Sequence, residues 1–289
     1  MIRFADNDTM QLVRDMWKVC FNDSDAFIEL YFSRKYRNRN TLVYFEEGQA
    51  VASLQILPYD VRFYGKVIPC GYISGACTLP DFRGRGYMKH LLMESFRVMQ
   101  DRQIALSLLI PAEDWLYGFY AKCGYQRTFE EGTRPIDLKS VLYKYPYNLQ
   151  EAYALFNSLY QEEDFCILKT ESDFSVIADE YIQDGCPAKY NLAGMSRVMD
   201  AWTLLDLYVK KNPRQSFRIK VTDDILNKES VYLIQNAGVE LVYGTDDFDI
   251  EVDIKMLTRL LWGFKTDELP EELSSRFEQH SPVMNLMLE

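Results

Sequence analysis

Residues 81–92, DFRGRGYMKHLL, pass within a few positions from a turn of two glycines and two arginines into a helical pattern. The preceding stretch, GYISGACTLP, is apolar and rich in small residues, which is typical of a buried strand with a close neighbour. Apolar residues then recur at helical spacing from Met88 to Met99, and a buried strand is predicted over Ile104–Ile110. This order places Gly84 and Gly86 where backbone N–H groups converge at a helix N-terminus.

A helix start of this kind favours a bound anion. Its free N–H donors and partial positive charge suit a phosphate, to which Arg83 and Arg85 would add charge-assisted hydrogen bonds. Two common nucleotide fingerprints do not fit. GxGxxG would need glycine where Lys89 stands, and GxxxxGK[ST] is absent. The sequence therefore predicts a phosphate site of another type.

Size and composition favour a folded protein of two domains. The chain has 289 residues, of which 48% are hydrophobic, and lacks a run of about 18 apolar residues that could span a membrane. Its first residues, MIRFADNDTM, lack the apolar core of a signal peptide. We therefore expect a cytoplasmic protein that does not associate with membranes.

Charge and metal-binding residue types exclude other classes. A net charge of −11 argues against nucleic-acid binding and would attract a cationic small molecule or peptide, although it can equally serve solubility. The six cysteines are scattered without a CxxC pair, and there are only two histidines. We expect buried thiols rather than disulfides, and no metal.

Local patterns predict further elements in the first half of the chain. A strand at Ile2–Phe4 precedes two helices, whose expected caps are Asp8-Thr9 and Ser24. The second of these helices is predicted over Asp25–Tyr36. The predicted strands that follow are Thr41–Phe45, Ala50–Leu57, Tyr59–Phe63, Val67–Pro69 and Gly71–Pro80.

The second half begins with two helices, roughly Leu149–Tyr160 and Ser172–Ile182, followed by a predicted helix at Met195–Leu205. Asp253 suits a helix cap, and Gly263 suits a helix stop. Four strands are expected between the Met195–Leu205 helix and the helix that Asp253 would cap. They are Ser216–Val221, Ser230–Gln235, Gly238–Tyr243 and Phe248–Ile254.

Two motifs within Ile73–Tyr125 carry a family resemblance. The turn at residues 83–88 resembles [Gln/Arg]-x-x-Gly-x-[Gly/Ala], the diphosphate loop of the GNAT superfamily of N-acetyltransferases, except that Met88 replaces the final small residue. FYAKCGYQ, Phe119–Gln126, resembles the Phe-Tyr-x-x-x-Gly-Phe/Tyr signature of the same superfamily. Together with ISGACTLPDFRGRGYM, these motifs resemble the enhanced-intracellular-survival (Eis-like) branch.

The resemblance implies an α/β (α+β) fold in three parts. Residues 1–138 would form the GNAT acetyl-CoA-binding catalytic domain with a mixed central sheet. Residues 139–193 would form a helical bridging segment, as a reduced second GNAT-like region. Residues 194–289 would form a sterol-carrier-protein-like domain whose C-terminal tail reaches the active site.

The resemblance also implies a transferase that moves acetyl from acetyl-CoA, its co-substrate, to a primary amine of a small cationic molecule or basic peptide. Tyr120 would be the general acid, because a phenol stays protonated at neutral pH. The expected cofactor-binding residues are Ala76, Cys77, Thr78, Arg83, Gly84, Arg85, Gly86, Tyr87 and Met88.

The base is open between several carboxylates. The predicted strand at residues 71–79 has no Glu, and Glu113 and Asp114 are of the kind usually solvated in a loop. In the Eis-like branch the terminal carboxylate acts as base, which here points to Glu289. The tail SPVMNLMLE is apolar enough to be buried, either in the first domain or on its own domain.

One alternative function is open, namely a non-catalytic carrier of a hydrophobic ligand with a vestigial or sensory acetyl-CoA site. Oligomers are possible. Acyl hydrolysis is disfavoured because Ser74 does not lie in GxSxG and neither histidine has an identifiable partner.

Overall fold

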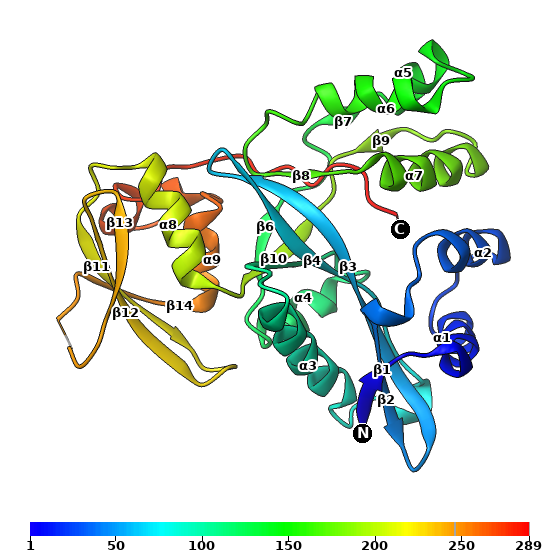
Figure 1. Cartoon of the computed structure of the whole chain (residues 1–289), viewed down its shortest axis with the longest axis horizontal. Helices are drawn as coiled ribbons and strands as arrows, with labels where there is room; N and C mark the ends of the chain where they lie inside the picture. Colours follow the sequence, from blue (N-terminus) through cyan, green and yellow to red (C-terminus); the bar gives the residue numbers. More distant parts are fainter. Residues whose placement is uncertain (246, 289) are drawn as a thin grey trace.

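The computed structural model describes residues 1–245 and 247–288, and a large mixed sheet dominates it (Figure 1). Within these residues eight strands join the sheet in the order β1-β2-β3-β4-β5-β10-β6, with β8 also paired to β3. In the described part of this sheet, only β4 and β5 pair in parallel. The strands are β1 (Ile2–Phe4), β2 (Thr41–Glu46), β3 (Gln49–Phe63), β4 (Lys66–Thr78), β5 (Leu106–Leu109), β6 (Gln126–Phe129), β8 (Cys166–Leu168) and β10 (Gly194–Val198).

The long hairpin of β3 and β4 corrects one prediction. Each strand was expected as two shorter ones, but both are continuous. Pro58 lies between the stretch of β3 paired with β2, which ends at Gln55, and the stretch paired with β8, which starts at Asp60. A residue without an N–H is tolerated in such an unpaired edge stretch. Proline and glycine residues within these strands therefore do not interrupt them, although they suggested separate strands in the sequence.

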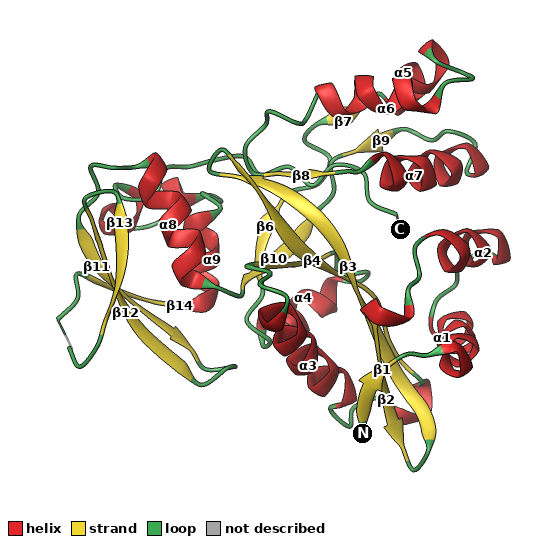
Figure 2. Ribbon diagram, in the orientation of Figure 1, coloured by secondary structure: helices red, strands yellow, loops and turns green. Residues whose placement is uncertain are grey.

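Helices cover both faces of this hairpin (Figure 2). On one side lie α1 (Asn7–Cys20) and α2 (Asp25–Arg34), and on the other α3 (Tyr87–Asp101). The α2 cap is Ser24, as predicted, but α1 is capped by Asp6 instead of Asp8-Thr9. Thr9 is instead the third residue of the helix and completes a capping box with Asp6, which satisfies two backbone donors at once.

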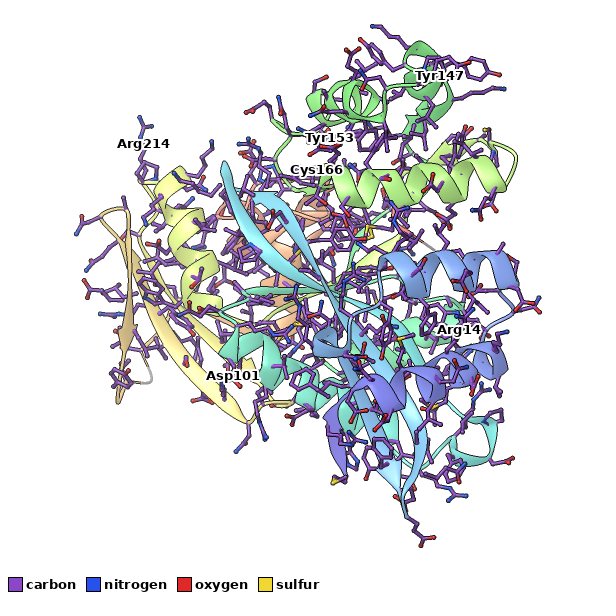
Figure 3. The ribbon with its side chains drawn as sticks, turned by 45° about the vertical axis from the view of Figure 1, so that its right-hand side comes forward. Arg14, Asp101, Tyr147, Tyr153, Cys166 and Arg214 are labelled. Carbon is purple, nitrogen blue, oxygen red and sulfur yellow. The ribbon has the colours of Figure 1, made fainter. Side chains whose placement is uncertain are left out.

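The bridging segment (residues 139–193) lies above the β3–β4 hairpin in Figure 1. The two predicted helices are confirmed as α6 (Leu149–Ser158) and α7 (Glu171–Gln183), while α5 (Leu138–Lys144) was missed. Short strands β7 (Pro135–Ile136) and β9 (Lys189–Tyr190) pair with each other. Tyr147, labelled in Figure 3, lies exposed at the outer end of the bridging segment.

The prediction of a helix over Met195–Leu205 was wrong for its first six residues. Residues Gly194–Val198 form β10, inserted between β5 and β6 of the large sheet, and the helix α8 starts at Ala201. All five residues of β10 are buried, so they show no alternation that would distinguish a strand from a buried helix. The large sheet thus takes one strand from beyond residue 193.

The C-terminal part contains a second sheet, at the left of Figure 1, in the order β13-β12-β11-β14. Helices α8 (Ala201–Lys211) and α9 (Ile254–Leu261) pack on it. Asp253 caps α9 and Gly263 follows it with φ of 61°, as the sequence predicted. Its strands are β11 (Phe217–Asp223), β12 (Lys228–Gln235), β13 (Gly238–Val242) and β14 (Ile250–Asp253), and a short α10 (Glu271–Ser274) follows.

Among the described residues, none of the helices is both long enough and apolar enough to span a membrane.

Candidate active site

The site begins with a bulge in β4. Ser74 and Cys77 lie opposite Gln55 and Ser53, so two residues, Gly75 and Ala76, face one residue of β3. Gly75 has φ of 55°, and an added Cβ would lie 2.3 Å from the Trp17 ring. Only glycine fits there, and the bulge removes Gly75 and Ala76 from the regular hydrogen-bond ladder.

On its other edge β4 separates from β5. The two strands pair only from Cys70 to Tyr72, opposite Leu106 to Leu108. Beyond these residues β4 continues to Thr78 while β5 ends at Leu109. The predicted contacts Ala76, Cys77 and Thr78 therefore lie where the described part of β4 has no neighbouring strand on this edge. Their backbone groups there can bind an extended ligand.

The turn after β4 leads directly into α3. Gly84 and Gly86 have φ of 77° and 83°, and an added Cβ on either would meet nothing within 4 Å. The glycines are therefore required by backbone conformation rather than by crowding within the chain. Gly86 is the N-cap of α3, and no side chain bonds to the helix start.

The start of α3 therefore presents free donors. The first turn carries no acidic side chain, and the first intrahelical bond runs from the His90 N–H to the Gly86 carbonyl. The N–H groups of Tyr87, Met88 and Lys89 precede that bond and have no partner within the helix. Met88 packs its side chain against an apolar cluster, so its departure from the family loop does not cover its N–H.

Two arginines flank these donors. The Arg83 Nε donates to the Thr78 carbonyl at 3.1 Å, and an Arg85 Nη donates to the Asp81 carbonyl at 2.9 Å. Both residues are exposed, and neither side chain forms an ion pair with a described residue. Their positive charge is thus available to an anion at the helix start.

Tyr120 lies near the C-terminal end of α4 (Asp114–Ala121). Its side chain is buried, and its ring packs against Phe119 and Tyr125. Burial, together with the neighbouring Cys123 thiol, raises the pKa of Tyr120 to about 12. The phenol therefore stays protonated at all physiological pH values.

The neighbouring tyrosines have other surroundings. The Tyr125 hydroxyl lies 2.6 Å from the Ser107 hydroxyl in the interior, which marks it as a packing residue. Tyr117 is partly buried beside the Arg127 guanidinium. Within residues 1–245 and 247–288, neither the Tyr120 nor the Tyr117 hydroxyl forms a hydrogen bond, and Tyr120 is the more deeply buried of the two, so its proton is free for a substrate in a protected position.

The candidate bases differ in how the structure describes them. Glu289 lies outside the described residues. Glu113 and Asp114 are exposed, and Glu113 accepts a hydrogen bond from the Trp115 indole at 2.9 Å. The carboxylates of Glu113 and Asp114, at the start of α4, thus have the solvated surroundings that the sequence suggested.

The tail before Glu289 is buried beside the bridging segment. The Val283 N–H donates to the Phe165 carbonyl, and the Ile167 N–H donates to the Val283 carbonyl. The Leu192 N–H donates to the carbonyl of Met284, whose side chain touches Gly194 of β10. Residues 283–288 thus pack against β8 and the large sheet rather than within the C-terminal sheet (Figure 1).

A polar group that the sequence analysis missed lies beside the bulge. Tyr31 of α2 donates to the Gln55 Oε1 at 3.0 Å, and its oxygen lies 2.9 Å from the Ser74 hydroxyl. The Gln55 Nε2 is buried without a partner among the described residues. It would lie 3.0 Å from a Cβ added to Gly75. A glutamine within the mostly apolar stretch Ala50–Leu57 is the signal that could have identified it.

Two cavities lie away from Tyr120, from the bulge in β4 and from the turn at residues 83–88. One, of about 670 Å³, lies between the end of α3, α8 and the C-terminal sheet, and the other, of about 450 Å³, lies between β3 and α6. Neither is lined by Tyr120 or by the turn at residues 83–88. The backbone geometry of β4 and α3 is the better guide to the chemistry, because an extended ligand bound along backbone needs no deep cavity.

Comparisons with known proteins agree with this geometry. Residues 1–128 match the sequence profile of a family described as "Acetyltransferase (GNAT) domain". No curated protein matches the sequence. The chain thus contains a GNAT acetyltransferase domain and is an enzyme of the acetyltransferase type, as expected.

Similar solved structures extend over the whole chain. A protein of unknown function from Enterococcus faecalis V583, called a probable N-acyltransferase, is 14% identical, with a TM-score of 0.74 and coverage of 99% of each chain. A GCN5-related N-acetyltransferase from Kribbella flavida is 13% identical, with a TM-score of 0.66 and coverage of 100% of this chain and 97% of that one. Eis1 from Mycobacterium abscessus is 12% identical, with a TM-score of 0.62 and coverage of 99% and 97%. The predicted α/β class and mixed GNAT sheet are confirmed.

Proposed function

We propose that the protein is an acetyl-CoA-dependent N-acetyltransferase that acts on a primary amine of a small cationic molecule or a basic peptide. The observation that carries this proposal is the uncapped start of α3, with two left-handed glycines and two exposed arginines directly after an opened strand. A diphosphate is the anion that such a cluster of N–H donors and guanidinium groups suits. Acetyl-CoA would supply a thioester, whose acyl group is already activated toward amines.

The roles of the binding residues follow from their positions. The N–H groups of Tyr87 and Met88, with the turn from Arg83 to Gly86, would hold the diphosphate. The backbone of Ala76, Cys77 and Thr78 would align the rest of the cofactor, and a free N–H there would polarise the acyl oxygen. This geometry holds the reactants without requiring a charged side chain on β4.

Two groups would move protons. Tyr120 would donate its proton to the departing sulfur, since its buried phenol is protonated at neutral pH. The carboxylate of Glu289 would accept the proton of the amine. In support of this proposal, the tail leading to it is buried against the large sheet. Because Leu286, Met287 and Leu288 are themselves buried, this role is tested by removing Glu289 alone.

The proposed acceptor class rests on charge. The net charge of −11 favours the approach of a cation. Trp17 and Tyr31 lie beside the bulge with ring centroids 4.5 Å apart, but both side chains are buried and pack the interior rather than facing a ligand. A polyamine-like molecule or a lysine-rich peptide complements this charge.

We also propose that the C-terminal part is a domain similar to a sterol carrier protein. Its inward-facing side chains, such as Ile219, Val252 and Leu257, belong to the main apolar cluster together with residues of the large sheet. That packing favours a structural role for these strands over the alternative of a hydrophobic-ligand carrier.

The proposal is tested by calorimetry with coenzyme A and by an amine panel. We expect micromolar-range binding of coenzyme A, and release of free thiol from acetyl-CoA only when a cationic amine is present. A well-folded protein that binds no coenzyme A would overturn the proposal. Binding without transfer to any amine would instead support the sensory alternative.

A further inference from the structure

Two cysteines that are 57 positions apart in the sequence meet beside the proposed cofactor site. Cys20 is the last residue of α1, and Cys77 follows the bulge in β4. The Cys20 thiol donates to the Thr78 carbonyl at 3.5 Å, which places it beside the adjoining Cys77, and Cys20 packs against the apolar cluster that contains Cys77. The Ser53 hydroxyl lies 3.4 Å from the Cys77 sulfur. Both thiols are free.

The two thiols have unlike surroundings. Cys20 is half-buried, whereas Cys77 is 5% exposed. The neighbouring Cys77 thiol, aided by the Arg83 guanidinium and opposed by burial, lowers the pKa of Cys20 to about 7. The neighbouring Cys20 thiol and burial raise the pKa of Cys77. Cys20 is thus the accessible thiolate, and Cys77 is its buried partner, an arrangement typical of redox-reactive pairs.

The remaining thiols lack these features. Burial raises the pKa of Cys70, Cys123 and Cys166. Cys186 is half-buried like Cys20 and therefore provides a matched comparison. A difference in reactivity between Cys20 and Cys186 would reflect the Cys77 and Arg83 neighbours rather than exposure.

We propose that Cys20 is a thiol-modification site, which reacts with a low-molecular-weight disulfide carrying phosphate groups and passes the bond to Cys77. Coenzyme A disulfide has this chemistry. Arg83 connects the reactive thiol with the proposed phosphate site. Its guanidinium bonds to the Thr78 carbonyl and neighbours the Cys20 thiol, and the same residue begins the proposed diphosphate turn. The preference for a phosphorylated disulfide rests on the proposed function, whereas the reactivity of the thiol pair does not.

The exchange balances in two steps. The Cys20 thiolate attacks one sulfur of the small disulfide, forms a mixed disulfide and releases one thiolate. Cys77 then loses its proton and attacks the Cys20 sulfur, which forms the Cys20–Cys77 disulfide and releases the second thiolate. The two cysteines are oxidised by two electrons, and the small disulfide is reduced to two thiols.

The product would alter the acyl-binding strand. A disulfide would join the end of α1 covalently to the segment from Cys77 to Thr78 and would restrict the movement of that segment. This segment is the proposed position of the acyl group, and Arg83 is anchored to it. We therefore expect oxidation to weaken coenzyme A binding at least tenfold, and reduction to restore it.

The experiment treats the full-length reduced protein with coenzyme A disulfide or with uncharged 2-hydroxyethyl disulfide, followed by intact mass and peptide mapping. We expect the wild type to lose two hydrogens at Cys20 and Cys77. Cys77→Ser should stop at a mixed disulfide on Cys20, Cys20→Ser should react at least tenfold more slowly, and Cys186→Ser should behave as the wild type. Circular dichroism checks that each variant is folded.

The charged and uncharged reagents separate the two proposals. Faster reaction with coenzyme A disulfide, abolished in Arg83→Ala, supports the phosphate preference. Equal rates with both reagents would overturn that preference while leaving the thiol pair intact, even in a protein that binds no coenzyme A. Equal labelling of Cys20 and Cys186, or a mapped disulfide that excludes Cys77, would overturn the modification site itself.

Discussion

Tyr120 shows how its surroundings prepare a single side chain for one role. A tyrosine in water ionises near pH 10, but burial raises the pKa of Tyr120 to about 12. The folded protein therefore keeps the proton on this oxygen across the working pH range. The proton is thus present on this oxygen when the sulfur departs, as a general acid requires.

Replacing Tyr120 with Phe should lower kcat by roughly 10²–10⁴-fold, because the ring remains while the proton is lost. The dissociation constant for coenzyme A should stay within about twofold of the wild-type value. Tyr117→Phe is the matched control, since that residue lies one turn earlier on α4 and is not assigned a role. Steady-state kinetics and calorimetry provide both readouts. Wild-type turnover in Tyr120→Phe would remove this residue from the mechanism.

Among the secondary-structure elements, the start of α3 depends on backbone conformation more than on side chains. Gly86 ends the turn with φ of 83° and leaves the helix uncapped. Most helices place Ser, Thr, Asp or Asn at this position, and their side chains would occupy the donors that an anion needs. The glycine thus favours ligand binding at the expense of helix stability.

Gly86→Ala tests this element. The added methyl meets nothing within 4 Å, but the left-handed conformation becomes strained by roughly 1–2 kcal/mol. Relaxation of that strain would turn the N–H groups away from the ligand, and we expect coenzyme A affinity to fall at least tenfold. Gly132→Ala carries similar strain, with φ of 69° in open space, in a loop away from the site. Similar losses of Tm in both variants, with weaker binding only in Gly86→Ala, would support this role for the turn.

At the scale of the whole molecule, the tail connects distant parts of the chain. Cys166, labelled in Figure 3, lies in the interior where Val283 bridges to β8. Next to it, the Lys169 ammonium donates to the Asn285 Oδ1 at 2.5 Å and lies 5.5 Å from the centre of the Tyr59 ring. Because this lysine is buried, its charge affects the stability of the whole assembly.

Burial lowers the pKa of Lys169 from 10.5 to about 8. Between these two values the unfolded chain binds more protons than the folded one, so this residue makes the unfolding free energy rise with pH. We expect its contribution to rise by roughly 2 kcal/mol between pH 7.5 and pH 9.5. Denaturant titrations of Lys169→Met should lack that rise, while Lys144→Met, at an exposed lysine, should keep it. Parallel pH curves for the wild type and Lys169→Met would show that Lys169 is not buried with its charge.

The sequence by itself determined the features that depend on short stretches of chain. The Ser24 and Asp253 caps, the left-handed glycines between β4 and α3, and the position of Tyr120 after β5 could all be predicted, because neighbouring residues set backbone conformation locally. The turn and the tyrosine that we propose as phosphate site and general acid were therefore predictable from short stretches of sequence.

Only the tertiary structure decided which distant segments meet. The insertion of β10 between β5 and β6, the docking of the tail on β8, the contact between Cys20 and Cys77, and the placement of Gln55 beside Gly75 all join residues far apart in sequence. Such pairings depend on burial and register across the whole core, which local spacing does not specify.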